Sequence, residues 1–149
     1  MNVLKRTLDE ILTVIGRNPI ESGGIIGCND GCICAFAFDD SYTSSFEYVP
    51  NTEYLNRKIK EWNGEGISFC GIVHSHLYGF NFPSASDKSY AMALLRFGVN
   101  IKDLYFPIVT VDDSELAHID FYGFMPQTED FVRLSLIDGG AEYYELAIA

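Results

Sequence analysis

The sequence predicts an α+β domain in which helices flank a mixed central β-sheet. The chain has 149 residues, the length of one domain, so we expect a single domain over residues 1–149. Hydrophobic residues make up 48% and charged residues 21%, close to the averages of globular proteins, which excludes a disordered chain. Segments with the period of a helix alternate with hairpins and buried strands, without an internal repeat or a linker.

The N-terminal part of the chain is predicted to contain two helices and three strands. Apolar residues recur at three- and four-residue steps over residues 3–16, which predicts a helix that ends at Gly16. Asn29-Asp30-Gly31 is a turn signal between two apolar segments and predicts a hairpin. The predicted elements are a helix at 3–16, strands at 20–28 and 32–38, a short strand at 46–49 and a helix at about 52–62.

The C-terminal part is predicted to contain mostly strands. An apolar run predicts that residues 67–76 form a buried strand. The elements predicted after it are an aromatic loop at 77–83, a helix at 84–98, and strands at 104–111, 116–124, 131–137 and 143–148. The pattern does not place residues 126–149 within the sheet.

The charge balance and the hydropathy exclude two classes of partner. Ten Lys and Arg residues against 21 Asp and Glu residues give a net charge of −11, and nucleic-acid binding needs a basic face, so we expect no nucleic-acid partner. The apolar runs are far shorter than about 18 residues, so we expect no membrane partner. The N-terminus lacks the apolar core of a signal peptide, which predicts a cytoplasmic protein.

Four cysteines offer a first candidate for metal or redox chemistry. They are Cys28, Cys32, Cys34 and Cys70. The first three lie in apolar, strand-like sequence, and the paired Cys-x-x-Cys spacing of a zinc knuckle is absent. We therefore expect buried thiols rather than disulfides or a zinc site.

Two histidines offer a second candidate. His74 and His76 end the predicted buried strand, and side chains two residues apart on a strand point to the same face. Two neutral imidazoles placed in this way chelate a divalent metal, for which zinc is the best match. Asp87 follows at the start of the next predicted helix and would be a third ligand. Three protein ligands leave one position open, as in catalytic rather than structural zinc sites.

Ser84 and Asp87 also have a structural interpretation. The segment Ser84-Ala85-Ser86-Asp87 is typical of a helix N-terminus, with Ser84 as the N-cap and Asp87 as the acidic residue three positions later. Such a cap would hold the Asp87 carboxylate rigidly at the first turn, from where it can reach a metal.

Glu21 is the candidate general base for the water that attacks the substrate. It directly precedes Ser22-Gly23-Gly24, and the two glycines permit a close backbone approach. A glutamate at the start of a strand is usually an ordinary surface residue, so this role depends on its combination with the histidines and Asp87. The spacing His-x-His, seven residues, Ser-x-x-Asp arises rarely by chance in a chain of this length.

These residues resemble the signature of the JAMM metalloproteases, whose domain is also called MPN. That signature is a Glu in an early strand, then His-x-His, seven residues and Ser-x-x-Asp, and all five positions match here. One difference is Leu77, because many members have a proline directly after the second histidine. The resemblance covers the chain to about residue 125 and implies an α/β/α sandwich similar to that of cytidine deaminases.

The resemblance implies a function and a role for each residue. His74, His76 and Asp87 would bind Zn²⁺, Glu21 would move a proton from water to the leaving amine, and Ser84 would hydrogen-bond the oxyanion. The substrate would be the peptide or isopeptide bond after the C-terminal Gly-Gly tail of a ubiquitin-like protein. The compact chain resembles the stand-alone bacterial and archaeal members, which are associated with ubiquitin-like sulfur carriers.

Three alternatives remain open. The first is a non-catalytic scaffold of the same fold, which tight zinc binding without hydrolysis of any ubiquitin-like fusion would favour. The second is a zinc hydrolase of another class, for example one that resembles the RadC branch of this fold. That branch tends to carry Asn between the two histidines and Pro after them, where this chain has Ser75 and Leu77. A zinc deaminase is disfavoured because its His-x-Glu and Pro-Cys-x-x-Cys motifs are absent. The sequence does not choose between precursor processing, isopeptide removal and release of a terminal amino acid, and it does not indicate an oligomeric state.

Overall fold

The fold is built on a β-sheet that closes on itself. The computed structural model describes residues 1–18, 21–40, 48–96 and 104–149. Strands account for 42% and helices for 28% of these residues. The described strands are β1 (Asn2–Leu4), β2 (Gly23–Asn29), β3 (Cys32–Asp39), β4 (Ser68–Ser75), β5 (Leu104–Tyr105), β6 (Ile108–Val111), β7 (Ala117–Met125), β8 (Asp130–Asp138) and β9 (Tyr143–Ile148). The described helices are α1 (Lys5–Gly16), α2 (Thr52–Gly64) and α3 (Ala85–Arg96).

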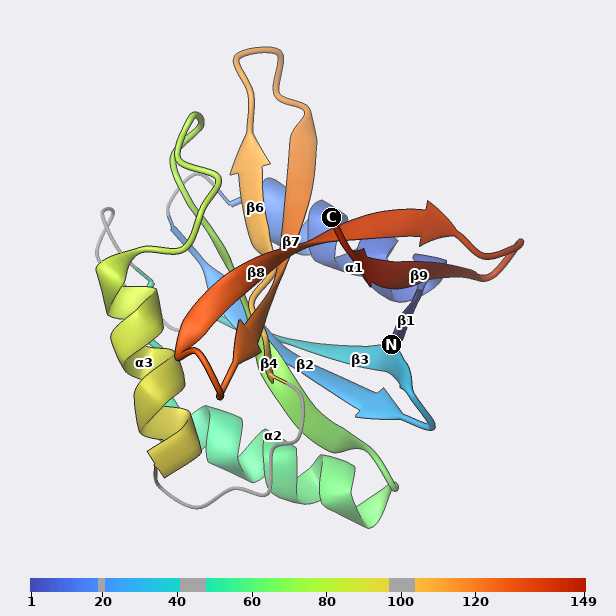
Figure 1. Cartoon of the computed structure of the whole chain (residues 1–149), viewed down its shortest axis with the longest axis vertical. Helices are drawn as coiled ribbons and strands as arrows, with labels where there is room; N and C mark the ends of the chain where they lie inside the picture. The colour runs from blue at the N-terminus through green and yellow to red at the C-terminus, as the bar shows by residue number, and fades with distance from the viewer. Residues whose placement is uncertain (19–20, 41–47, 97–103) are drawn as a thin grey trace.

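Eight strands form a closed barrel. The strand order is β2-β3-β1-β9-β8-β7-β5-β4, and β4 returns to pair antiparallel with β2. The short strand β6 joins the same sheet through β4 and β7. The prediction of a mixed central sheet flanked by helices, and with it the α/β/α sandwich, is therefore wrong: the protein is a mostly-β barrel (Figure 1). The hydrophobic pattern identifies strands but not which distant strands pair, and that pairing is what closes the sheet.

The two ends of the chain close the barrel. Residues 2–4 form β1, which pairs in parallel with β3 and antiparallel with β9, with Val3 opposite both Ile33 and Tyr144. The predicted helix at 3–16 therefore begins two residues late, at Lys5. The strands predicted at 131–137 and 143–148 are confirmed as β8 and β9, and the structure places both in the barrel wall.

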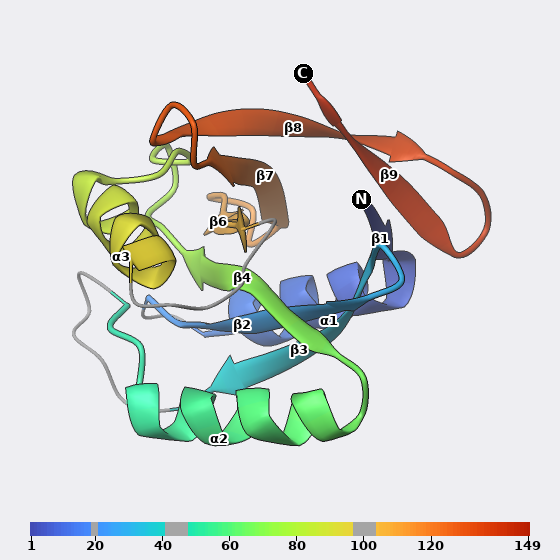
Figure 2. The ribbon, with the colours of Figure 1, turned by 60° about the horizontal axis from the view of Figure 1, so that its bottom comes forward.

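Helix α1 packs on one face of β2 and β4, and helices α2 and α3 pack on the other face (Figure 2). On one face, α1 buries Leu8, Ile11 and Ile15 in a cluster that also contains Ile26 and Val73. On the other face, the second cluster contains the neighbouring residues of the same two strands, together with residues of α2 and α3: Ile25, Ile72, Leu55, Trp62 and Ala91. Because both faces of β2 and β4 are buried, this part of the barrel is a firm support for the residues at its end.

Other sequence predictions have mixed outcomes. The hairpin around Asp30 is confirmed, with Asp30 and Gly31 both at positive φ. The segment predicted as one strand at 104–111 is two short strands, β5 and β6, separated by Phe106 and Pro107. The predicted strand at 46–49 begins outside the described residues, and Tyr48 and Val49 are not in a strand. Helix α3 is described to Arg96, so its predicted end at residue 98 also lies outside them. No helix of the described residues is long and apolar enough to cross a membrane.

Candidate metal centre

Two histidines stand together at the C-terminal end of β4. His74 is paired with Gly23 of β2, and the backbone N–H groups of His74 and His76 donate to the carbonyls of Pro107 and Val109, at 3.3 and 2.9 Å. The main chain is thus fixed on both sides. The two imidazole rings lie on the same side of the strand, with centroids 4.6 Å apart. The predicted same-face histidine pair is therefore present in the structure.

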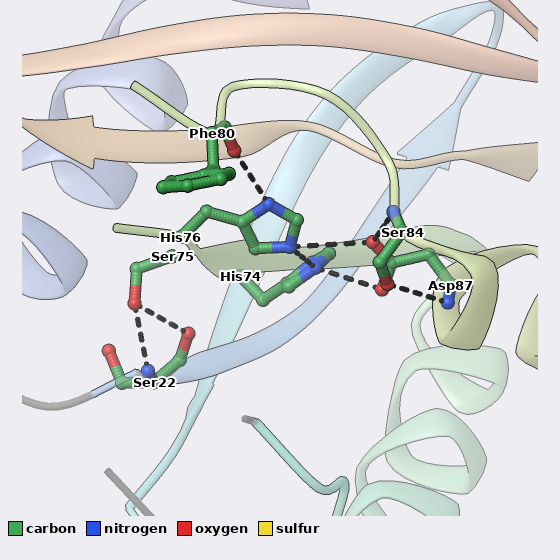
Figure 3. Close-up of polar contacts among 7 residues, drawn as sticks. All are labelled: Ser22, His74, Ser75, His76, Phe80, Ser84 and Asp87. Atoms are coloured by element: carbon green, nitrogen blue, oxygen red, sulfur yellow. Dashed lines mark hydrogen bonds and ion pairs between the residues drawn. The ribbon is translucent and has the colours of Figure 1, made fainter. Parts of the chain in front are cut away.

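The third side chain comes from the first turn of α3. The Ser84 hydroxyl accepts a hydrogen bond from the Asp87 N–H at 3.1 Å, and the Asp87 carboxylate accepts one from the Ser84 N–H at 2.7 Å. These reciprocal bonds form a capping box, which confirms the predicted helix start at Ser84. They also fix the orientation of the carboxylate, which points toward the histidines (Figure 3).

The three side chains converge on a single point. The two Nε2 atoms are 2.8 Å apart, and the Asp87 oxygens lie 3.0 Å from Nε2 of His74 and 3.4 Å from Nε2 of His76. Ligands of a tetrahedral zinc at 2.0–2.1 Å stand about 3.3 Å from one another. One donor atom from each residue lies within 4.8 Å of the others. The donor set fits zinc in number, chemistry and spacing, so this group can hold a metal ion.

His76 has a defined tautomer when it is neutral. Its Nδ1 lies 2.8 Å from the carbonyl oxygen of Phe80, and a carbonyl only accepts, so Nδ1 must carry the proton. The lone pair of Nε2 is then directed toward His74 and Asp87. The same arrangement orients metal-bound histidines in other proteins. In the metal-free protein burial lowers the pKa of His76, but hydrogen bonds to Asp87 and Phe80 outweigh burial and raise it above its usual value.

The negative charge of Asp87 favours metal binding. Partial burial raises the pKa of this carboxyl, but hydrogen bonds from His74 and His76 and from the Ser84 N–H lower it far below its usual range. Asp87 is therefore an anion at any physiological pH, and its side chain is only 15% exposed. Nδ1 of His74 is buried without a hydrogen-bond partner in the described part of the chain.

Glu21 lies beside the three converging residues. The Ser22 N–H donates to the Ser75 hydroxyl and the Ser75 N–H donates to the Ser22 carbonyl, both at 2.9 Å. This clamp holds the start of β2 against the end of β4. A Cβ at Gly23 would stand 2.6 Å from the Val73 carbonyl, so the close backbone approach predicted there is confirmed. Glu21 lines the same open cleft of about 300 Å³ as His74, His76, Ser84 and Asp87.

Sequence reasoning missed Tyr48. Its ring stacks against His74 with centroids 6.4 Å apart, and its hydroxyl donates to the buried Asp39 carboxylate at 2.9 Å. Burial, followed by the contact with Asp39, raises the pKa of Tyr48 well above its usual range. Tyr48 therefore remains a neutral wall of the cleft. Nothing in the sequence indicates this, because Tyr48 is far from His74 along the chain and belongs to no regular element.

The aromatic loop borders the cleft only in part. Leu77 and Phe80 line it, and both side chains are more than half exposed. Tyr78 and Phe82 do not line it and are equally exposed. The sequence alone does not show whether the aromatic residues of this loop line a groove or cover the core. Its exposure excludes a role in the core.

The fold is MPN-like, and its site is a His-His-Asp group that can hold a metal ion. The chain is similar to the crystal structure of a JAB1/MPN domain protein from Archaeoglobus fulgidus, with a TM-score of 0.53 and 20% identity over 93% of this chain and 100% of the other.

Two solution structures are also similar. A protein from Desulfitobacterium hafniense has a TM-score of 0.68 and 18% identity, covering 91% of this chain and 90% of its own. A protein from Salinibacter ruber has a TM-score of 0.62 and 18% identity, covering 92% and 90%. No family profile and no curated protein matches the sequence. At these identities the likeness establishes the fold and not the activity.

Proposed function

We propose that this protein is a zinc-dependent peptidase that hydrolyses the bond after the C-terminal Gly-Gly tail of a ubiquitin-like or sulfur-carrier protein. The observation that carries the proposal is the convergence of His74, His76 and Asp87 in an open cleft that Glu21 and Ser84 also line. The MPN-like fold and the five-position match to the JAMM signature support the choice of reaction.

Each residue of the site has a place in such a hydrolysis. Zinc bound by His74, His76 and Asp87 would supply Lewis-acid polarisation of the scissile carbonyl. Glu21 accepts the proton of the attacking water and delivers it to the leaving amine. Ser84 already accepts a hydrogen bond from the Asp87 N–H, so its own hydroxyl proton can be donated to the developing oxyanion.

Selectivity must come from the cleft, because Lewis-acid chemistry acts on any amide. Leu77 and Phe80 form a bulky wall next to His76, and Tyr48 forms a second wall next to His74. An extended glycine pair passes between such walls more easily than residues with branched side chains. This supports a Gly-Gly tail as substrate over the interior of a folded protein.

The decisive experiment uses a ubiquitin-like protein fused to a reporter through its Gly-Gly terminus. We expect cleavage directly after the second glycine, seen by mass spectrometry of the products. Replacement of the penultimate glycine by valine should block it. Equal cleavage of the valine tail, or equal degradation of a casein-like protein, would contradict the tail-selective proposal.

The same assay separates the alternatives. A protein that binds one zinc per chain but cleaves no fusion would be a non-catalytic scaffold. A protein that hydrolyses small amides but no protein tail would be a zinc hydrolase of another class.

The partner that we propose is the substrate protein itself, and the compartment that we propose is the cytoplasm.

A further inference from the structure

The orientation of His76 depends on one backbone carbonyl in an exposed loop. The Phe80 carbonyl accepts the Nδ1–H of His76 at 2.8 Å, and this bond directs Nε2 toward His74 and Asp87. The loop reaches this position through a tight turn, with Gly79 at φ +92 and the Phe80 N–H bonded to the Leu77 carbonyl at 2.9 Å. Many residues of the loop are exposed, so its own packing does not hold that carbonyl in place.

Asn81 ties the loop to the barrel through two separate bonds. Its side-chain Nδ2 donates to Oδ2 of Asp120 at 3.1 Å, and its carbonyl accepts from the Tyr122 hydroxyl at 2.6 Å. Asp120 and Tyr122 are two residues apart on β7 and therefore face the same side of that strand. Asn81 is half-buried between two neighbours, Phe80 and Phe82, that are 59% and 56% exposed. Of these three consecutive residues, Asn81 is the one that bonds to the barrel.

These bonds act directly on the peptide group that His76 needs. The Phe80 carbonyl and the Asn81 nitrogen belong to one planar peptide unit, so fixing the side chain and the carbonyl of Asn81 restricts the direction of the Phe80 carbonyl. Asp120 is itself held, because its other oxygen accepts from Arg133 of β8. A continuous path of hydrogen bonds and one peptide plane therefore runs from the wall of the barrel to Nε2 of His76.

We propose that Asn81 is a positioning residue for the metal centre: it holds the Phe80 carbonyl so that His76 presents an unprotonated Nε2 to the metal. The inference rests on the proposed metal-dependent function and adds to it a residue outside the five-position signature. It also explains how this loop keeps its shape with Leu77 where many JAMM members have proline. Two tethers to β7 replace the stiffness that a proline ring supplies.

Asn81→Asp is the sharpest single test. The variant keeps the size of the side chain, removes the donor and places a carboxylate against the Asp120 carboxylate. We expect the Kd for zinc, measured by competition with a chelating dye, to rise about tenfold, the lower end of the effect of outer-shell changes. In the metal-free variant, ¹⁵N NMR should show neutral His76 as a mixture of tautomers, whereas the wild-type protein should show Nδ1–H alone. Asn56→Asp, the same substitution at an exposed position of α2, should change neither quantity.

A reciprocal exchange supplies the rescue. In Asn81→Asp/Asp120→Asn the carboxylate at 81 accepts from the amide at 120, whose oxygen still accepts from Arg133. We expect zinc affinity to return to within about threefold of wild type and the single tautomer to reappear. If Asn81→Asp fails to fold, this exchange and Tyr122→Phe, which removes the other tether, carry the test.

Two results would overturn the inference. One is a folded Asn81→Asp protein with wild-type zinc affinity and tautomer, and the other is a loss that a folded double variant does not restore. Neither measurement needs a substrate. A wild-type protein that binds zinc without hydrolysis would therefore refute the proposed function and leave the role of Asn81 decided by its own data.

Discussion

The strand β2 has a group of potential metal ligands at each end, and only one group converges. At its start, Gly23 pairs with His74, and the two histidines meet a carboxylate from α3. At its other end, Cys28, Cys32 and Cys34 gather on the β2–β3 hairpin. Among the described residues, only the histidine end brings three donor atoms within 4.8 Å of one another.

The difference shows what makes a site from suitable residue types. The three cysteines all come from one hairpin, and no carboxylate or imidazole from a second element joins them in a group of donor atoms within 4.8 Å of one another in the described part of the chain. The ligands at the histidine end come from two elements that the fold brings together. The two ends also differ in protonation. Burial raises the pKa of the Cys32 and Cys34 thiols, which favours their protonated form, whereas hydrogen bonds lower the pKa of the Asp87 carboxyl, which favours its anion. All four cysteines are free thiols, as predicted, but only Cys70 is buried; Cys28, Cys32 and Cys34 are half-buried, so the prediction that these three are buried is wrong.

The largest effect is expected when the potential metal ligands at each end of β2 are removed in turn. His74→Ala/His76→Ala removes two of three ligands, so we expect zinc to fall from about one per chain to near zero and hydrolysis to disappear. The control variant, Cys28→Ser/Cys32→Ser/Cys34→Ser, removes the three sulfur donors at the other end of β2 and should retain both zinc and hydrolysis. Zinc is measured by atomic spectroscopy of purified protein. Loss of zinc from the cysteine variant alone would reverse the assignment.

The next largest effect concerns proton transfer. Glu21→Gln keeps the shape of the side chain but cannot accept a proton at neutral pH. We expect the rate of cleavage of the Gly-Gly fusion to fall by about 10²–10⁴ while zinc content stays unchanged. A variant that loses zinc would make Glu21 a ligand, and a variant with wild-type rate would remove it from the mechanism.

Ser84→Ala should affect both rate and stability. Loss of the cap is expected to cost about 1 kcal/mol of the free energy of unfolding. Loss of an oxyanion donor is expected to lower the rate by about 10²–10³. Asn51→Ala is the matched control, because Asn51 caps α2 by accepting from the Tyr54 N–H at 3.2 Å. It should lose a similar stability, measured by urea unfolding, with an unchanged rate. Equal rates for both variants would assign Ser84 to the cap alone.

The smallest effect tests the cysteine end. A raised pKa means that less thiolate is present at a given pH, and the thiolate is the reactive form. We expect iodoacetamide to modify Cys32 and Cys34 a few times more slowly at pH 8 than it modifies free cysteine, with rates that rise toward pH 9.5. Peptide mass spectrometry follows each site separately. Faster reaction than free cysteine would indicate an activated thiol and a functional role for the hairpin.

The candidate metal ligands could be predicted from the sequence because all three lie close together in the chain. His74, His76 and Asp87 lie within 14 consecutive residues, and strand periodicity and helix capping place them without knowledge of the whole fold. Glu21 is distant, but it was found because the signature includes it. Tyr48 and Asn81 were missed, since their roles arise from contacts with Asp39, Asp120 and Tyr122 that no local pattern encodes.

The architecture was predicted less well for the same reason. Individual strands follow from alternation and turn residues, and nearly all of them were placed. Closure of the barrel depends on the pairing of Val3 with Tyr144, which are far apart in the chain. A strand of three residues such as β1 is also too short to show a period.

The pairing of β1 with β9 has a consequence for biosynthesis. A ribosome releases the N-terminal strand long before residues 143–148, so β1 must wait for its antiparallel neighbour through most of translation. During that time Leu8, Ile11 and Ile15 can meet β2 and β4, but the wall on the β8–β9 side is missing. The nascent chain therefore displays an open sheet edge until β9 emerges, and an open edge is a template for pairing with other chains.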